Sequence, residues 1–160
     1  LIKVIQHTKN YTALIVGDGP ALPLLKRYAK KNKLNLKIHF IGKLPYFKMF
    51  SYTANCNIGW MMIRDKGLSN QFALPNKLFE YTLMGLQVVS SALPNIQPII
   101  DNNNFGICIK DFKTKAIIEA LQNLDKNTTS RFEISQKTIS KYTWNTQHNI
   151  FIQAVENYDF

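Results

Sequence analysis

The sequence lacks the features of a membrane-spanning, secreted or disulfide-stabilised protein. It has 2 cysteines among 160 residues, and Cys56 and Cys108 are too far apart for a zinc or redox motif. We therefore expect two reduced thiols, as in the cytoplasm. No apolar run reaches the ~20 residues of a transmembrane helix, and the first residues do not have the pattern of a signal peptide. Hydrophobic residues make up 46% of the chain, which is typical of one soluble domain with its own core.

Acidic residues are also few, with 10 Asp and Glu against 20 Lys and Arg, so the formal net charge is +10. This excess fits three kinds of partner: nucleic acid, an anionic membrane surface or an anionic small ligand. Most lysines are scattered, and only Lys30, Lys31 and Lys33 form a local cluster. Nucleic-acid binders usually combine such clusters with exposed aromatic side chains. We therefore expect no nucleic-acid partner, and consider peripheral contact with an anionic membrane or a glycolipid acceptor a better fit.

A recognisable metal site or catalytic triad is missing as well. The 3 histidines, His7, His39 and His148, are isolated from one another along the sequence. A metal site or a triad needs several such groups in one constellation. We therefore expect no bound metal and assign no catalytic residue.

Short apolar runs alternate with amphipathic stretches along the whole chain. The apolar runs predict strands at residues 12–16, 37–41, 57–61, 86–91 and 105–109. The amphipathic stretches predict helices at residues 1–8, 20–33, 45–55, 75–84, 113–124, 130–141 and 145–158, with residues 64–73 as a loop and 94–104 as a turn. This alternation favours an α/β domain with a single doubly wound parallel sheet, which binds ligands beyond the carboxyl ends of its strands.

The most informative segment runs from Leu74 to Asn95. Pro75 fits the first turn of a helix, Asn76 can cap the free amides there, and Gly85 fits the left-handed residue that ends such a helix. The next residues form a short apolar strand suited to a parallel sheet. The N-terminus of this helix would therefore lie at a ligand crevice and offer its amides to an anion.

This segment resembles the donor-binding signature of glycosyltransferases of the GT-B fold, in particular the group 1 (family 4) class. The matching letters are PNKLFEY and GLQVV, with Gln87 where the family usually has Pro. Further stretches are similar to other motifs of the family, namely TALIVGDGP at 12–20, KIHFIGKLP at 37–45 and YTWN at 142–145. The resemblance implies a Rossmann-like domain, the C-terminal half of a GT-B glycosyltransferase, that binds a nucleotide sugar.

The resemblance also assigns roles to three residues of the signature. Glu80 would contact the ribose of the donor, since a carboxylate has two acceptor oxygens at the spacing of a vicinal diol. Asn76 and Lys77 at the helix start would hold the diphosphate and could replace a divalent metal. From residue types alone, a solvated Glu80 paired with Lys77 is the more common arrangement, and Asn76 could equally be a plain cap.

Two further loops are expected to face the same crevice. Gly17, Asp18 and Gly19 form a strand-to-helix loop where backbone could approach a ligand closely, although an ordinary tight turn has the same sequence. Gly42 and Lys43 follow the next strand, and the resemblance implies that this loop lies near the base of the nucleotide. Lys43 could also simply be solvated.

The sequence departs from the family at one place that matters. Many members have a second glutamate eight residues before the one on ribose, and here that position is Phe72. The usual contact to the donor sugar is therefore in doubt, and the roles of Arg64 and Asn70 in the preceding loop stay open. Because the chain begins at Leu1 rather than Met, we expect the family's first loop and its acceptor-binding domain to precede it.

These observations lead to one interpretation and two alternatives. We expect the donor-binding domain of a hexosyltransferase that uses a UDP- or GDP-linked sugar, without metal or other cofactor, and a glycan or glycolipid acceptor of the cell envelope or capsule. The 160 residues alone should be inactive, and the protein should be cytoplasmic with peripheral contact to the inner membrane face. The alternatives are a relative of nucleotide-sugar epimerases and a non-catalytic module that binds polyanions.

Overall fold

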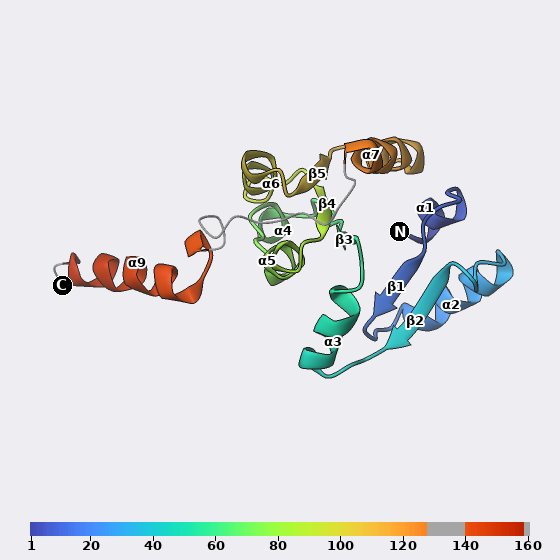
Figure 1. Ribbon diagram of the computed structural model, residues 1–160, viewed down its shortest axis with the longest axis horizontal. Helices are drawn as coiled ribbons and strands as arrows, with labels where there is room; N and C mark the ends of the chain where they lie inside the picture. Colours follow the sequence, from blue (N-terminus) through green and yellow to red (C-terminus); the bar gives the residue numbers. More distant parts are fainter. Residues whose placement is uncertain (128–139, 159–160) are drawn as a thin grey trace.

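Strands and helices alternate along the chain as the sequence predicts. The computed structural model describes residues 1–127 and 140–158. Its elements, in chain order, are α1 (Ile2–Gln6), β1 (Ala13–Val16), α2 (Leu22–Lys31), β2 (Ile38–Gly42), α3 (Tyr46–Thr53), β3 (Ile58–Met61), α4 (Leu68–Gln71), α5 (Asn76–Leu83), β4 (Gln87–Ser91), α6 (Gln97–Asn103), β5 (Gly106–Ile109), α7 (Thr114–Asn127) and α9 (Trp144–Glu156) (Figure 1). The predicted helix at 130–141 lies almost entirely outside the described residues.

All strand pairs in the described residues are parallel, but they form two sheets instead of the single predicted sheet. One sheet contains β1 and β2, and the other has the order β3-β4-β5 with β4 in the centre (Figure 1). The parallel α/β class is therefore confirmed, and the prediction of one continuous sheet is wrong. The physical reason is that strand–helix alternation fixes the direction of each strand, while it does not fix which strands are neighbours.

Each of the two sheets has outer strand edges that no further strand pairs among the described residues, and those of β1 and β3 are two of them. Across the β1–β2 pair the Ala13 N–H donates to the Lys37 carbonyl at 2.8 Å. Because backbone groups alternate in direction along a strand, those of Leu14 point away from β2. By the same alternation the backbone groups of Ile58 and Trp60 point away from β4. Neither edge is paired within the described part of the chain.

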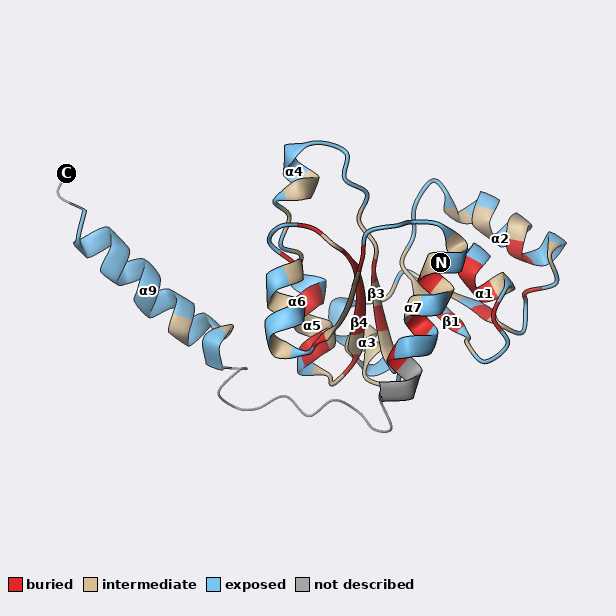
Figure 2. Cartoon of the chain, turned by 90° about the horizontal axis from the view of Figure 1, so that it is seen from above, coloured by how far each residue is buried: buried red, intermediate tan, exposed pale blue. Residues whose placement is uncertain are grey.

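Hydrophobic side chains cover both faces of the three-stranded sheet. On one face Val88 packs with the inner sides of α5 and α6, and on the other Val89 packs with α7 and with Val4 of α1. Both valines are completely buried, as expected for the central strand of a parallel sheet (Figure 2). A third cluster joins α1 and α2 to the β1–β2 pair.

The predicted helix–turn–strand unit is present, with one correction at its start. Pro75, with φ −69° and ψ 141°, holds the N-cap position, so Asn76 is the first helical residue and not the cap. Gly85 has φ 74°, and the N–H of Leu86 donates to the Tyr81 carbonyl at 3.0 Å, so the predicted glycine stop is confirmed.

Two segments predicted as irregular contain helices. The predicted turn at 94–104 is wrong, because α6 occupies most of it with Pro98 in its first turn and Asn104 in the left-handed conformation after its last turn. Proline is compatible with that first-turn position, and Ile100 supplies a fully buried anchor. The predicted loop at 64–73 contains the single turn α4. No helix among the described residues has the length and apolar character to span a membrane.

Candidate functional site

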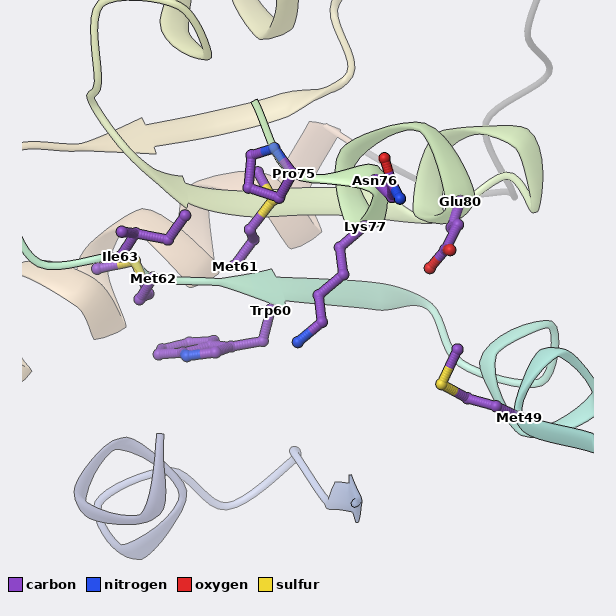
Figure 3. Close-up of a pocket in the computed structure, with 9 residues that line it drawn as sticks. All are labelled: Met49, Trp60, Met61, Met62, Ile63, Pro75, Asn76, Lys77 and Glu80. Atoms are coloured by element: carbon purple, nitrogen blue, oxygen red, sulfur yellow. The ribbon is translucent and has the colours of Figure 1, made fainter. Parts of the chain in front are cut away.

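A cavity of about 610 Å³ lies where β3 ends, between the start of α5 and the helix α3. This volume is within the range of small-molecule sites, about 300–1,000 Å³. Its lining combines an apolar floor with a few polar groups, and consists of Met49, Trp60, Met61, Met62, Ile63, Pro75, Asn76, Lys77 and Glu80 (Figure 3). The structure thus gathers three of the predicted binding residues, Asn76, Lys77 and Glu80, around one space at the carboxyl end of a parallel strand.

The start of α5 gives this cavity a positive character. The N–H groups of Asn76 and Lys77 belong to the first turn, where no carbonyl of the same helix can accept them. The first bond across this turn runs from the Leu78 N–H to the Pro75 carbonyl at 3.0 Å. The Lys77 side chain extends across the cavity towards Trp60 (Figure 3). The first-turn amides, the positive end of the helix dipole and the exposed Lys77 ammonium group therefore lie together at the start of α5, beside the cavity.

Glu80 lies one turn after Asn76 and brings a carboxylate to the edge of the cavity. The hydroxyl of Tyr46, the first residue of α3, donates a hydrogen bond to Glu80 Oε1 at 2.9 Å. The ion pairs of the described residues are Lys113–Asp111 and Lys115–Glu119, so Glu80 is not paired with Lys77. The ion pair of the alternative is therefore absent among the described residues, and this carboxylate keeps acceptor capacity for a ligand.

The charge of Glu80 affects the ionisation of two neighbouring tyrosines. The hydrogen bond to Glu80 raises the pKa of Tyr46, with smaller contributions from burial and from the carboxylate charge. Burial raises the pKa of Tyr81, and the charges of Glu80 and Cys56 add to this effect. Both hydroxyls therefore stay protonated at neutral pH, and Tyr46 can act as a donor to the carboxylate.

The packing of Tyr81 fixes α5 on the sheet that carries the cavity. Its ring lies against Gly59 of β3, at a place where any Cβ would overlap the ring. One turn earlier on the same face of the helix, Leu78 is completely buried in the core cluster against which Tyr81 packs. Because the helix is held at both points, the position of Glu80 relative to the end of β3 is determined by packing and not by a flexible loop.

Comparison with known proteins assigns the chain to a family. Residues 1–127 match the family described as glycosyl transferases group 1. The chain belongs to this family. The resemblance predicted from the PNKLFEY signature is therefore confirmed. No curated protein matches the chain.

Three solved structures resemble this group 1 chain in fold. HepE (Alr3699) of Anabaena, solved in complex with UDP, has a TM-score of 0.76 at 14% identity, over 99% of this chain and 44% of its own. The sucrose-phosphate synthase tll1590 of Thermosynechococcus elongatus has a TM-score of 0.69 at 13% identity, over 98% and 42%. WaaG, a glycosyltransferase involved in lipopolysaccharide biosynthesis, has a TM-score of 0.61 at 16% identity, over 92% and 37%. The chain therefore has the Rossmann-like fold of these proteins and spans less than half the length of each.

The other predicted contact residues of this group 1 chain lie outside the cavity lining. Gly17 directly follows β1 with φ 131°, and Gly42 ends β2 with φ 82°. The Gly17 N–H donates to the Gly42 carbonyl at 2.8 Å. The Gly19 N–H donates to the carboxylate of Asp18 at 2.8 Å, as in a tight turn. Lys43 is exposed. The structure thus joins the two loops to each other, and the second loop leads into α3, whose Tyr46 bonds Glu80. None of the five residues lines the cavity itself, and their contact with a nucleotide stays a prediction.

Sequence reasoning missed the apolar floor of the cavity. Met62 and Ile63 directly follow β3. The Ser91 hydroxyl, at the end of β4, fixes Ile63 by accepting from its N–H at 2.7 Å and donating to its carbonyl at 2.6 Å. The place of these residues at the carboxyl end of a parallel strand could have predicted that they line the crevice. The run of Trp60 to Ile63 is apolar, however, and such a run is typical of a buried core.

Residues 64–73 do not contribute to the lining of the cavity. The Asn70 side chain donates to the Arg64 carbonyl at 3.0 Å, and Asn95 donates to the Phe72 carbonyl at 2.8 Å. Phe72 itself is 58% exposed. These bonds shape the loop, and the roles of Arg64 and Asn70 towards a ligand stay open. Within the described ranges, no three His, Cys, Asp or Glu side chains are grouped so that they could hold a metal ion.

Proposed function

We propose that this chain is the donor-binding part of a glycosyltransferase that transfers a hexose from a UDP- or GDP-linked sugar. The observation that carries the proposal is the single cavity shared by the free helix start of α5 and the carboxylate of Glu80. The first feature suits a diphosphate and the second suits a ribose diol. The similar fold of HepE, which was solved with UDP, supports this choice of ligand.

In the proposed reaction, Asn76 and Lys77 stabilise the leaving nucleoside diphosphate. Negative charge grows on this group as the glycosidic bond breaks, so amides and an ammonium placed there stabilise the transition state more than the ground state. Glu80 orients the donor through its ribose and takes no part in bond making. Positive charge from the protein would make a divalent metal unnecessary at this site.

We further propose a glycan or glycolipid of the cell envelope or capsule as the acceptor. WaaG, whose fold is similar, acts in lipopolysaccharide biosynthesis, which supports this class. The described cavity has one carboxylate among its lining residues. An epimerase would need acid and base groups on both sides of the sugar, so this observation favours transfer over epimerisation. Acceptor contacts would come from outside these 160 residues, which would leave them inactive alone.

Calorimetric titration with uridine, guanosine and adenosine diphosphates tests the donor site. We expect weak binding of one or more of them, because the contacts from one side of a cleft only partly offset the costs of ordering and desolvating the ligand. Addition of a chelator should leave the affinity unchanged. If no nucleoside diphosphate binds while a short oligonucleotide or an anionic polysaccharide does, the polyanion-binding alternative replaces this proposal.

We also propose that α2 brings the protein to the anionic, cytoplasmic face of the cell membrane. Between Asp18 and Asp65 the sequence has no acidic residue, and its basic residues are Lys26, Arg27, Lys30, Lys31, Lys33, Lys37, Lys43, Lys48 and Arg64. Those on α2 are exposed and have no ion-pair partner among the described residues. Leu24 on the same helix is 66% exposed and could enter the headgroup region.

A vesicle-binding assay tests the role of α2. Lys30→Glu combined with Lys31→Glu should lower partitioning onto phosphatidylserine-containing vesicles by about tenfold or more, since each cation near such a surface contributes about 1 kcal/mol. The control is Lys113→Glu with Lys115→Glu, which changes the net charge equally at the start of α7. Equal losses in both double variants, or no binding by the unchanged chain, would contradict a docking surface on α2.

A further inference from the structure

The hydrogen bond from Tyr46 to Glu80 connects two parts of the chain that are 34 residues apart. Tyr46 begins α3, which follows β2, whereas Glu80 belongs to α5, which packs on β3 and β4. The bond therefore links the end of the two-stranded sheet to the cavity beside the three-stranded one. None of the sequence motifs assigns a role to this tyrosine.

We propose that Tyr46 is a positioning residue that holds the Glu80 carboxylate ready for the ribose hydroxyls of the nucleotide. This role rests on the proposed donor site. A carboxylate can accept about four hydrogen bonds, so the one from Tyr46 at Oε1 leaves room for both hydroxyls of the diol. The remaining acceptor positions are then fixed in space before the ligand arrives.

The surroundings of Tyr46 suit this role. Its ring makes edge-to-face contacts with Phe47 and Phe50, at centroid distances of 5.8 and 4.7 Å, which restrict its orientation. Among the described residues, the Tyr46 hydroxyl is the group that donates a hydrogen bond to the Glu80 side chain. Because the hydrogen bond raises the pKa of Tyr46, the hydroxyl keeps its proton at neutral pH.

The physical benefit is a smaller ordering cost on binding. A glutamate side chain has several rotatable bonds and loses conformational entropy when a ligand fixes it. Glu80 is only half-buried, so packing alone restrains it incompletely. Once Tyr46 has fixed the carboxylate, the ribose meets a preorganised acceptor and more of the binding energy is retained.

The test compares ligands with and without the ribose hydroxyls. The affinities of uridine and guanosine diphosphates and of their 2′,3′-dideoxy counterparts are measured by calorimetry for the unchanged chain and for Tyr46→Phe. Loss of one hydrogen bond to a charged group, acting through Glu80, should weaken binding of the parent nucleotide by about threefold to tenfold. Binding of the dideoxy nucleotide should not change.

Two further variants separate positioning from a purely structural tether. Tyr52→Phe, on the same helix, should change neither affinity, and Tyr46→Phe should have no additional effect in a Glu80→Ala background. If Tyr46→Phe weakens the parent and dideoxy ligands equally, or weakens neither, Tyr46 does not position Glu80. If the unchanged chain binds no nucleoside diphosphate, or does not distinguish it from its dideoxy form, the proposed ribose site fails and this role fails with it.

Discussion

Replacing Glu80 by alanine should weaken nucleoside diphosphate binding by about tenfold to a hundredfold. In the proposed donor site the lost interaction would be a pair of hydrogen bonds between ribose hydroxyls and the carboxylate, and bonds to a charged group contribute about 1.5–3 kcal/mol. The carboxylate has no ion-pair partner among the described residues, so its removal breaks no salt bridge within them. The measurement is calorimetric titration of the variant beside the unchanged chain.

Two controls make the Glu80 result interpretable. Glu80→Gln keeps one acceptor oxygen and should lose less affinity than Glu80→Ala. Glu119→Ala removes the same charge from α7, where the carboxylate is exposed and lies 3.9 Å from Lys115, and should leave affinity unchanged. Equal affinity in Glu80→Ala and the unchanged chain would show that this carboxylate does not contact the nucleotide.

Gly106→Ala should destabilise the fold by about 3 kcal/mol or more, at the upper end of overpacking effects. Gly106 pairs with Val88 of the central strand, and a Cβ there would overlap the Val88 carbonyl oxygen and lie 2.6 Å from the Val88 nitrogen. Its φ of 150° also disfavours a side chain. Because the obstacle is the backbone of a completely buried residue, no rotamer change can relieve the overlap.

Urea denaturation followed by circular dichroism measures this effect. The midpoint should fall while the slope of the transition stays unchanged, which marks a change in stability and not in the unfolded state. Gly19→Ala is the matched control, since no atom lies within 4 Å of its added Cβ. A Gly106→Ala midpoint equal to that of Gly19→Ala would contradict the close approach of β4 and β5.

Local signals allowed the helix–turn–strand unit of α5 and β4 to be predicted from the sequence. Pro75 and Gly85 act through their own backbone preferences, so the bounds of α5 follow from a short stretch of chain. Glu80, four residues after Asn76, is placed on the cavity side by helical spacing alone. The correct parts of the prediction are thus those that depend on neighbours within about one or two turns.

The features that escaped prediction depend on contacts between distant residues. Nothing near β1 or β3 in the sequence says that these strands fail to pair, because pairing is decided by tertiary arrangement. The Tyr46–Glu80 bond joins two helices that follow different strands. The helix α6 was missed because Pro98 and the asparagines near it are turn residues by preference, whereas burial of Ile96 and Ile100 favours a helix there.

The unpaired edges of β1 and β3 also affect how the chain behaves in concentrated solution. Such an edge presents free amides and carbonyls to any extended segment, including one from a second copy, and this is a common start of aggregation. The net charge of +10 makes copies repel one another and opposes such contacts. Salt shortens the range of this repulsion, to about 3 Å at 1 M, so concentrated salt removes the main barrier between two copies and their open edges.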